Sequence, residues 1–498
     1  GFFDSTDGFD YDFSAITGDV LGGVYEKYLS LSRLPESERT DKSKRKLRGI
    51  FYTPRHVVDY LLSNSLDELF ADGYDPRKIR VLDPACGSGT FLVSAFDRLV
   101  RERSKTKDSG LLDEIEVATE NLFGIDIDAQ ATEIARLNIF LKCLRSDVQL
   151  PDLSSNITEA NTLLIPNLTS AGGGFGDLAV DDVALELDKD FPGLNGTGGF
   201  DLIIGNPPYV FARGKSFTPA MKKHLESNYS VAKYQLNTYS LFIERAFQLL
   251  RDGGYLAFIV PNTWLTIQAH SELRKFLALN TEKLKIVNVL DKVFQDAAVD
   301  TSLIIAKKGK GSVLEILELA DGQYNSKCLV DKSLIEGGGP ISISALSNPV
   351  SIGILEKVTE KSRPLGEFAK VKSGLKAYEV GKGSPQQTKE MKDARVYHHT
   401  SAQSSISRRY LQGRDVCRYR LEWAGQWLEY GANLAATRVS QIFEGERIIV
   451  RQIPSRPPYC INAALTTEDY VHDINSNVVL DVKEITTYSL LAILNSRM

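Results

Sequence analysis

The stretch Phe200-Asp201-Leu202-Ile203-Ile204-Gly205-Asn206-Pro207-Pro208-Tyr209 joins an apolar run to a proline corner. The run from Phe200 to Gly205 is typical of a buried strand, and the corner begins where that strand ends. The two prolines lack backbone donors and fix φ, so the corner keeps one shape while its carbonyl oxygens stay free to face a ligand. The sequence therefore predicts a pocket at the carboxyl end of a buried strand.

The side chains of this corner suit a planar amine. Asn206 adds a side-chain oxygen and Tyr209 adds a flat ring. Such an amine can donate its two hydrogens to the Asn206 oxygen and the Pro207 carbonyl while its ring stacks on Tyr209. Its nitrogen is then free to attack a methyl group. The residues that we expect to be catalytic are Asn206, Pro207, Pro208 and Tyr209.

Strands alternate with helices from about residue 78 to residue 308. Predicted strands are 78–82, 122–126, 200–205 and 255–260, and predicted helices are 89–101, 129–144 and 238–250. Residues 285–290 and 302–307 are strands close enough in sequence to run antiparallel. This order predicts an α/β, Rossmann-like core: a mostly parallel sheet with helices on both faces and a terminal antiparallel strand pair. Ligands of such sheets bind at the carboxyl ends of the strands.

A second informative stretch, Val81-Leu82-Asp83-Pro84-Ala85-Cys86-Gly87-Ser88-Gly89-Thr90-Phe91-Leu92, places an acid and small residues between a strand and a helix. The small residues let the backbone wrap tightly around a ligand. A dinucleotide fingerprint needs a third glycine where this chain has Leu92. The next predicted strand ends at Asp126, whose carboxylate can accept hydrogen bonds from both hydroxyls of a ribose. The pattern therefore favours a nucleoside cofactor, and S-adenosylmethionine is one.

Composition sets wider bounds. The 498 residues are 43% hydrophobic and 25% charged, as in a globular protein of two or three domains. The five cysteines form no C-x-x-C pair, which favours reduced thiols in a cytoplasm and predicts no metal site. We find neither a signal-peptide pattern nor an apolar stretch of membrane-spanning length, so no membrane partner is expected. The chain begins with glycine and stops directly after an apolar run, so we expect a fragment of a longer protein.

The net charge of -5 is unevenly distributed. Residues 361–498 hold 20 Lys and Arg against 14 Asp and Glu, whereas the rest holds 39 against 50. A basic segment beside an acidic body indicates local attraction to phosphate, and a solvated basic face is the alternative explanation.

Four motifs together resemble the γ-class amino-methyltransferases of DNA restriction-modification systems. They are Phe51-Tyr52-Thr53-Pro54, the loop from Asp83 to Gly89, Gly124-Ile125-Asp126 and the Asn-Pro-Pro-Tyr corner, in that order. The resemblance is to the adenine-N6 branch of type IIG-like enzymes with a TaqI-like specificity domain, part of which Leu411-Gln412-Gly413-Arg414-Asp415 resembles.

The resemblance implies that one set of residues surrounds S-adenosylmethionine: Tyr52, Thr53, Pro54, Asp83, Ala85, Gly87, Gly89, Asp126 and Asn161. Asp126 would hold the ribose. Asn161 stands where the family usually has an aspartate near the cofactor's adenine amino group. Because asparagine can still accept a hydrogen bond, we expect a weaker preference rather than lost binding. Phe294 would cover the face of the target base opposite Tyr209.

A base inside a duplex cannot reach this corner, so the resemblance implies base flipping with stacking on Tyr209 and Phe294. Candidate contacts to DNA are Arg213, Lys215, Arg408, Arg409, Arg414, Arg418 and Arg420. A solvated loop explains the first two equally well, and some of the others are surface arginines in the alternative view.

We expect four regions: an N-terminal helical connector (1–70), an S-adenosylmethionine-dependent methyltransferase domain (71–310), a linker (311–365) and a truncated α+β target-recognition domain (366–498). The predicted function is site-specific methylation of adenine N6 in double-stranded DNA, in a restriction-modification or phage-defence system. Another planar amine (cytosine N4, an RNA base or a protein glutamine) is the alternative substrate. Two further alternatives remain open. The chain is the modification half of a fused restriction enzyme, with a nuclease outside these residues, or it is a non-catalytic DNA reader.

Overall fold

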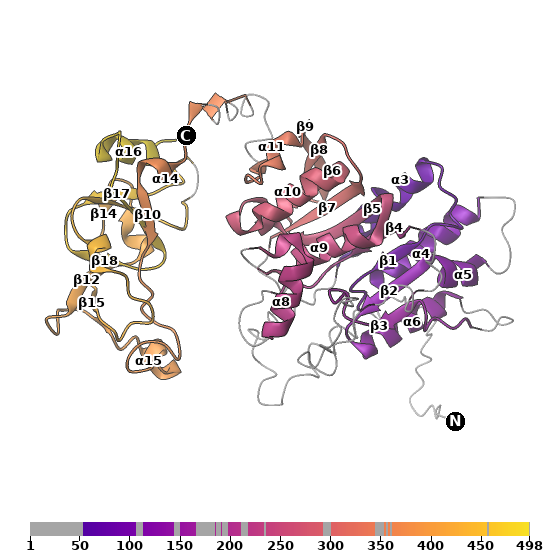
Figure 1. The fold of residues 1–498 in the computed structure, drawn as a ribbon, viewed down its shortest axis with the longest axis horizontal. Coiled ribbons are helices and arrows are strands. Elements are labelled where there is room, and N and C mark those ends of the chain that lie inside the picture. The colour runs from indigo at the N-terminus through magenta and orange to yellow at the C-terminus, as the bar shows by residue number, and fades with distance from the viewer. Residues whose placement is uncertain are drawn as a thin grey trace, which may run out of the picture. The chain divides into compact units, whose positions relative to one another are not determined.

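The structure is a computed structural model in which the chain forms two compact units, residues 1–355 and residues 356–498. It describes residues 53–105, 113–143, 150–165, 185, 191, 198–210, 218–233, 236–291, 300–343, 353–354, 357–358, 361–455 and 458–497. Figure 1 shows the elements of each unit.

Among the described residues, a nine-stranded sheet forms the centre of the first unit, in the order β3-β2-β1-β4-β5-β7-β6-β8-β9. Its strands are β1 (Val81–Asp83), β2 (Leu122–Asp126), β3 (Ile157–Glu159), β4 (Phe200–Gly205), β5 (Leu250–Pro261), β6 (Thr281–Val289), β7 (Thr301–Lys308), β8 (Val313–Ala320) and β9 (Gln323–Asp331). Strands β3, β2, β1, β4 and β5 are parallel, and β7 lies antiparallel between β5 and β6. The predicted Rossmann-like core with its antiparallel pair is confirmed.

Strand β1 has β2 on one side and β4 on the other, so the strand order reverses between β1 and β4. The carboxyl ends of these strands carry Asp83, Asp126 and the proline corner. Parallel sheets of this kind bind ligands at such a reversal, because the crossing connections diverge there. The fold therefore gathers the motifs predicted from the sequence at one edge of the sheet.

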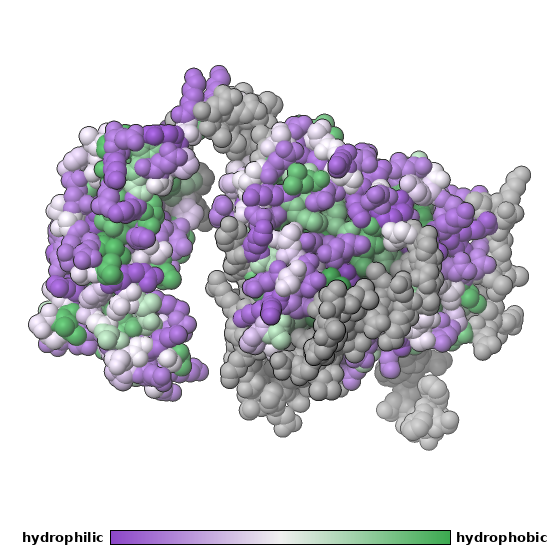
Figure 2. All heavy atoms as spheres, viewed as in Figure 1, coloured by the Kyte–Doolittle hydropathy of each residue, from purple (hydrophilic) through white to green (hydrophobic). Residues whose placement is uncertain are grey.

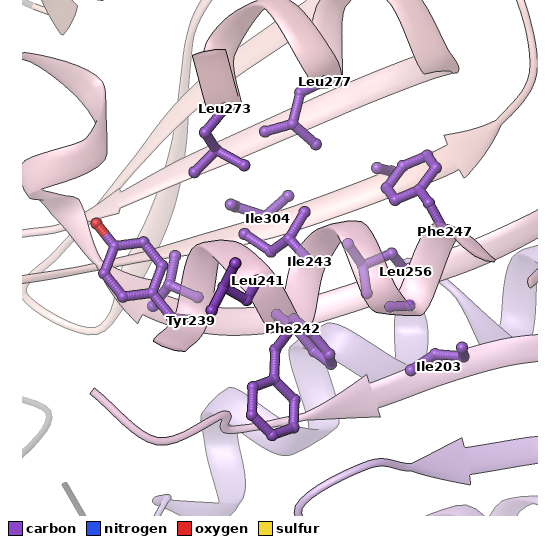
Figure 3. Close-up of a cluster of buried hydrophobic side chains, with 14 of the residues drawn as sticks. Ile203, Tyr239, Leu241, Phe242, Ile243, Phe247, Leu256, Leu273, Leu277 and Ile304 are labelled. Carbon is purple, nitrogen blue, oxygen red and sulfur yellow. The ribbon is translucent and has the colours of Figure 1, made fainter. Parts of the chain in front are cut away.

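Alternate residues of each strand pack against different helices. Leu202 and Ile204 of β4 join the core beneath one layer of helices, whereas Ile203 joins the core on the opposite face. The first layer is α2 (Arg55–Ser63), α3 (Leu66–Ala71), α4 (Thr90–Arg103) and α6 (Ala129–Cys143). The second layer is α9 (Thr238–Leu249) and α10 (Ser271–Asn280). Figure 3 shows side chains of α9 and α10 gathered with Ile203, Leu256 and Ile304 of the sheet.

Shorter elements complete the first unit: α5 (Asp113–Glu116), η4 (Val117–Asn121), α8 (Pro219–Asn228), η6 (Ser230–Ala232), η7 (Asn262–Leu265), η8 (Gln268–His270) and α11 (Ser333–Glu336). Helix α8 begins with a proline after Thr218, whose side chain accepts a hydrogen bond from the Met221 amide. Such a cap satisfies an amide that the helix itself leaves without a partner.

The expected linker at 311–365 is wrong for residues 313–331, which form β8 and β9 of the central sheet. Strand β8 pairs in parallel with β6, from Lys283 opposite Val313 onward, and β9 pairs antiparallel with β8. The strands were misassigned because a run that is half exposed does not reveal which distant strand it pairs with. Helices α2 and α3 of the expected N-terminal connector also pack on the sheet.

The second unit consists of small sheets and short helices. Its strands are β10 (Lys370–Ser373), β11 (His398–His399), β12 (Ser407–Leu411), β13 (Val416–Cys417), β14 (Arg420–Leu421), β15 (Trp427–Glu429), β16 (Arg447–Arg451), β17 (Ala463–Thr466), β18 (Tyr470–His472) and β19 (Ser476–Leu480). They form sheets in the orders β10-β19-β16-β17, β11-β15-β12-β18 and β13-β14. The helices are α14 (Leu365–Phe368), α15 (Lys389–Ala394), η9 (Gly413–Asp415), η10 (Ser440–Phe443) and α16 (Thr487–Leu494).

The face of the molecule in Figure 2 mixes hydrophilic side chains with smaller apolar areas. Across the part of the chain that the structure describes, no helix combines the length and the apolar character needed to cross a membrane.

Candidate active site

The proline corner directly follows β4, and the start of helix α9 holds it. Thr238 donates its hydroxyl to the Pro208 carbonyl and accepts a hydrogen bond from the Val210 amide at 2.9 Å. The Thr238 amide in turn donates to the Val210 carbonyl at 3.1 Å. Pro207 and Pro208 have no amide hydrogen, so these two residues offer no backbone donor to hold the turn. Its shape therefore depends on a side chain 30 residues further along the chain.

Asn206 connects the corner to the motif that precedes the core. Its Nδ2 donates to Thr53 Oγ1 at 3.2 Å, although the two residues are 153 positions apart. Thr53 is buried, and Pro54 is the N-cap residue of α2. Two motifs that the sequence analysis treated separately thus meet at the carboxyl end of β4.

Tyr209 is half-buried, and two contacts hold its side chain in place. Its hydroxyl donates to the Ile259 carbonyl of β5 at 3.0 Å. Its ring meets Tyr239 edge to face, with 6.3 Å between the ring centroids. Burial raises the pKa of Tyr209 well above its ordinary value, so the hydroxyl stays protonated and remains a donor.

Asp83 and Gly205 bring the ends of β1 and β4 into close contact. A Cβ atom added at Gly205 would lie 2.5 Å from Asp83 Oδ1, so only glycine fits there. Asp83 Oδ1 accepts a hydrogen bond from the Ala85 amide at 3.1 Å. The other oxygen, Oδ2, is buried and has no hydrogen-bond partner among the described residues.

Burial is the main reason that the pKa of Asp83 rises to about 8, and the nearby Asp126 carboxylate raises it further. A buried carboxylate oxygen that lacks a partner is costly unless a ligand brings a donor or a positive charge. The ammonium and sulfonium groups of S-adenosylmethionine carry such charge. The residues present at this strand end therefore fit that cofactor.

The glycine loop after β1 is tied to its neighbours by side chains. Asp126 Oδ2 accepts a hydrogen bond from the Gly87 amide at 2.9 Å, and its Oδ1 accepts one from the Asp128 amide at 3.0 Å. Burial raises the pKa of Asp126, although these amide donors oppose the rise. Besides its expected role toward a ribose, Asp126 thus fixes the loop.

Gly89 is where the loop passes closest to helix α6. It has φ +86°, and an added Cβ would lie 3.1 Å from Ala135 Cβ. Both the left-handed backbone and this approach require glycine. Asn138 of α6 also donates to the Ser88 carbonyl at 2.8 Å. The loop and α6 therefore form one tightly packed joint.

Asn161 lies two residues beyond β3, at the same sheet edge as Asp126. Its Oδ1 accepts a hydrogen bond from the Leu163 amide at 3.1 Å. The next residue, Thr162, donates its hydroxyl to the Pro84 carbonyl of the glycine loop at 2.7 Å. Asn161, which we expect on the adenine side of the cofactor, is thus the neighbour of a residue that contacts the loop, and its role stays a prediction.

Several expected site residues lie outside the described residues: Tyr52, Arg213, Lys215 and Phe294. Their roles stay predictions.

The expected DNA-binding arginines of the second unit differ in their surroundings. Arg408 pairs with Asp469 at 2.9 Å and Arg409 pairs with Glu468 at 2.8 Å. Arg420 pairs with Glu422. In each pair a carboxylate would have to be displaced before the guanidinium met a phosphate.

Arg414 and Arg418 differ from these paired arginines. The Arg414 side chain is 68% exposed and its Nε lies 4.0 Å from Asp415 Oδ1, so it is the arginine best placed for a partner in solution. Arg418 Nε donates to the Asn495 carbonyl at 3.0 Å, and its guanidinium lies 4.0 Å from the Tyr459 ring centroid.

Sequence reasoning missed Thr238, Tyr229 and Arg245, whose contacts hold the corner and the segment after β3. Thr238 stands at the start of a predicted helix, which was the one available signal. Among the described residues, no group of three or more His, Cys, Asp and Glu side chains is arranged to hold a metal ion.

Part of each unit resembles a known protein family. Residues 120–294 match the family described as Eco57I restriction-modification methylase, and residues 408–498 match the TaqI-like C-terminal specificity domain. The chain thus carries an Eco57I-like restriction-modification methylase domain followed by a TaqI-like specificity domain. Methyltransferases of this family use S-adenosylmethionine in general.

Two relatives are named for their activities. The chain is 28% identical over 346 residues to the type II restriction enzyme and methyltransferase RM.Eco57I of Escherichia coli, covering 62% of this chain and 33% of that protein. It is 27% identical over 229 residues to the adenine-specific methyltransferase PglX of Streptomyces coelicolor, covering 42% of this chain and 18% of that protein. The chain therefore spans a third or less of the length of these relatives.

The fold is similar to that of the type IIL restriction-modification enzyme MmeI in complex with DNA. The TM-score is 0.58 at 16% sequence identity, over 98% of this chain and 68% of that one. This likeness confirms the predicted architecture, a mostly parallel α/β unit followed by a separate β-rich unit.

Proposed function

We propose that the chain is a site-specific DNA methyltransferase that transfers a methyl group from S-adenosylmethionine to the N6 amino group of an adenine in double-stranded DNA. The observation that carries this proposal is the proline corner at the end of β4, clamped by Thr238 and joined through Asn206 to Thr53. It stands beside the buried Asp83 oxygen that lacks a partner among the described residues. Amine acceptors and a cation-binding carboxyl thus share one sheet edge.

The corner's task is to prepare the amine. The lone pair of adenine N6 is delocalised into the ring, so the nitrogen is a poor nucleophile until its hydrogens are drawn out of the ring plane. The Asn206 oxygen and the Pro207 carbonyl accept those hydrogens, and the Tyr209 ring holds the base by stacking. The bound cofactor supplies the electrophilic methyl group. Positioning and charge complementarity supply most of the rate effect, and the proton leaves to solvent.

Around the cofactor, Asp83 would face the positive charge, and the backbone from Ala85 to Gly89 would enclose its methionine end. Asp126 would accept hydrogen bonds from the ribose, and Asn161 would accept one from the adenine amino group. Thr53 and Pro54, with Tyr52, would close over the methionine end of the cofactor.

The target adenine reaches the corner only after it is flipped out of the duplex, at a cost of a few kcal/mol. Residues 366–498 would read the DNA sequence. Arg414 is the first candidate contact, because its side chain is 68% exposed and its ion pair with Asp415 is long, at 4.0 Å. We place the protein in the cytoplasm, within a restriction-modification or phage-defence system, with a nuclease domain fused to or associated with it.

The test is incubation of the chain with labelled S-adenosylmethionine and DNA of mixed sequence, followed by mapping of the modified bases. N6-methyladenine at one recurring sequence is the expected result. Label on cytosine N4 would instead make cytosine the target. Parallel incubations with RNA and with protein test the other two planar amines. Loss of the label in Asn206→Ala, with cofactor binding retained, is expected as well, whereas Asn325→Ala on exposed β9 is the matched control that keeps full activity.

A further inference from the structure

The segment after β3, residues 160–165, is held from two sides. On the side of the glycine loop, the Ala160 amide donates to the Asp126 carbonyl at 3.0 Å, and the Thr162 hydroxyl donates to the Pro84 carbonyl. On the other side, three side chains from the chain that follows the corner reach its backbone. This segment carries Asn161, so its position matters for the adenine end of the cofactor.

Two of those three contacts are fully buried. Tyr229 donates its hydroxyl to the Leu163 carbonyl at 2.8 Å, and Arg245 Nε donates to the Thr162 carbonyl at 3.1 Å. The third contact is half-buried, where the Ile165 amide donates to His224 Nε2 at 3.2 Å. Each contact joins the segment to a residue 59 or more positions further along the chain.

Arg245 is an unusual residue for this place. Its side chain is only 6% exposed, and no carboxylate of the described residues forms an ion pair with it. Burial lowers its pKa, which shows that the charged form is disfavoured there. A buried guanidinium whose hydrogen-bond partners among the described residues are the Thr162 carbonyl and the Gln248 side chain is a costly way to stabilise a helix.

Arg245 lies seven residues after Thr238 on helix α9. Two helical turns take about seven residues, so both side chains project from the same face, roughly 10 Å apart along the axis. One face of α9 therefore holds the proline corner at its first residue and the segment after β3 two turns later. Glu244 strengthens this side, because it accepts hydrogen bonds from the Ser230 and Val231 amides next to Tyr229.

We propose that Arg245 and Tyr229 are positioning residues that fix residues 160–165, and with them the adenine end of S-adenosylmethionine, relative to the proline corner. This inference rests on the proposed function. Helix α9 acts as the common support, so the distance between the amine acceptors and the cofactor is set by one rigid element. Neither residue touches the reacting atoms.

The test compares Arg245→Lys with Arg103→Lys. Arg103 is also a buried arginine, but it hydrogen-bonds Asn121, just before β2, at the amino-terminal edge of the sheet. Both variants should lose thermal stability, and Arg103 also pairs with Glu116 at 3.0 Å. Only Arg245→Lys should raise the Kd for S-adenosylmethionine, by about tenfold in calorimetry without DNA, because a charge-assisted hydrogen bond beside the adenine site is lost. Hydrogen exchange of the amides in 160–165 should quicken in that variant alone.

Tyr229→Phe is the second, gentler variant, since it removes one hydroxyl and keeps the ring in the core. We expect its Kd for the cofactor to rise by about threefold. Equal Kd values and equal exchange in Arg245→Lys, Tyr229→Phe and Arg103→Lys would overturn the inference, even if the wild type methylates DNA. A wild-type chain that binds no S-adenosylmethionine would instead overturn the proposed function.

Discussion

Replacing Gly205 with alanine adds one methyl group at the end of β4. We expect it to damage the candidate active site more than any other substitution there that adds or removes a methyl group. The new Cβ would lie 2.5 Å from Asp83 Oδ1, a separation that real Cβ atoms essentially never show. The backbone at Gly205 cannot move away, because it belongs to a central strand, and the Asp83 side chain has little free space, since it is 1% exposed. The Asp83 carboxyl must therefore rotate away.

The magnitude follows from two losses. Forcing one extra methyl group into a packed core costs about 1–3 kcal/mol. Rotation of Asp83 also breaks its hydrogen bond from the Ala85 amide, which contributes about 1 kcal/mol. We expect the free energy of unfolding of the first unit to fall by about 2–4 kcal/mol, and cofactor affinity to fall because Asp83 no longer faces its site.

Urea unfolding followed by tryptophan fluorescence, with calorimetry for cofactor binding, measures both effects. Gly337→Ala is the matched control, because an added Cβ there meets nothing within 4 Å and lies in the same unit. In the background Asp83→Ala the clash is gone, so Gly205→Ala should cost much less. If Gly205→Ala unfolds and binds like Gly337→Ala, or if the Asp83→Ala background leaves its cost unchanged, the assigned contact is wrong.

Three further predictions concern charge and hydrogen bonding. The pKa of Asp83 is 3.8 in the unfolded chain and about 8 in the folded protein. Its contribution to stability should therefore fall as the pH rises between these values, while affinity for the cationic cofactor rises toward pH 8. Asp83→Asn should flatten both pH profiles. Thr238→Val should lower stability by about 1–3 kcal/mol and reduce kcat with an unchanged cofactor Kd, since the clamp on Pro208 is lost; an unchanged kcat contradicts its role. Arg414→Ala should weaken DNA binding and reduce its salt slope by about one, whereas Arg420→Ala, paired with Glu422, should change it less; equal slopes would move the interface elsewhere.

The central strands and the corner could be predicted from the sequence, because both are determined by residues that are close together in the chain. The apolar run before Asn206 and the proline pair after it determine β4 and its end without help from distant residues. Asp83 and Asp126 were also placed correctly at strand ends, since each follows a short apolar run before a helix.

Long-range pairing was harder to predict. A strand was expected at residues 255–260, yet β5 already begins at Leu250; it opens opposite Phe200 with a register shift and takes up Gly253 with φ +76°. The pairing of β8 with β6 was likewise missed, because only the finished sheet shows which edge is available.

The candidate site shows the same limit. Its motifs were found by resemblance, but the side chains that hold them were not. Nothing in the spacing of Thr238 indicates that its hydroxyl meets a carbonyl 30 residues earlier. The arginines of β12 looked free in the sequence, whereas Glu468 and Asp469 pair with them from about 60 residues away.

The hairpin of β8 and β9 has a practical consequence for separating the two units. A chain cut after residue 310, where the sequence placed the end of the catalytic domain, would strip β6 of its parallel neighbour and bare seven backbone pairings from Lys283 to Val289. It would also remove Tyr324, whose ring stacks on Tyr60 of α2 at 3.6 Å between centroids. An uncovered strand edge of that length invites self-association. A soluble catalytic half should therefore extend to residue 343 or beyond.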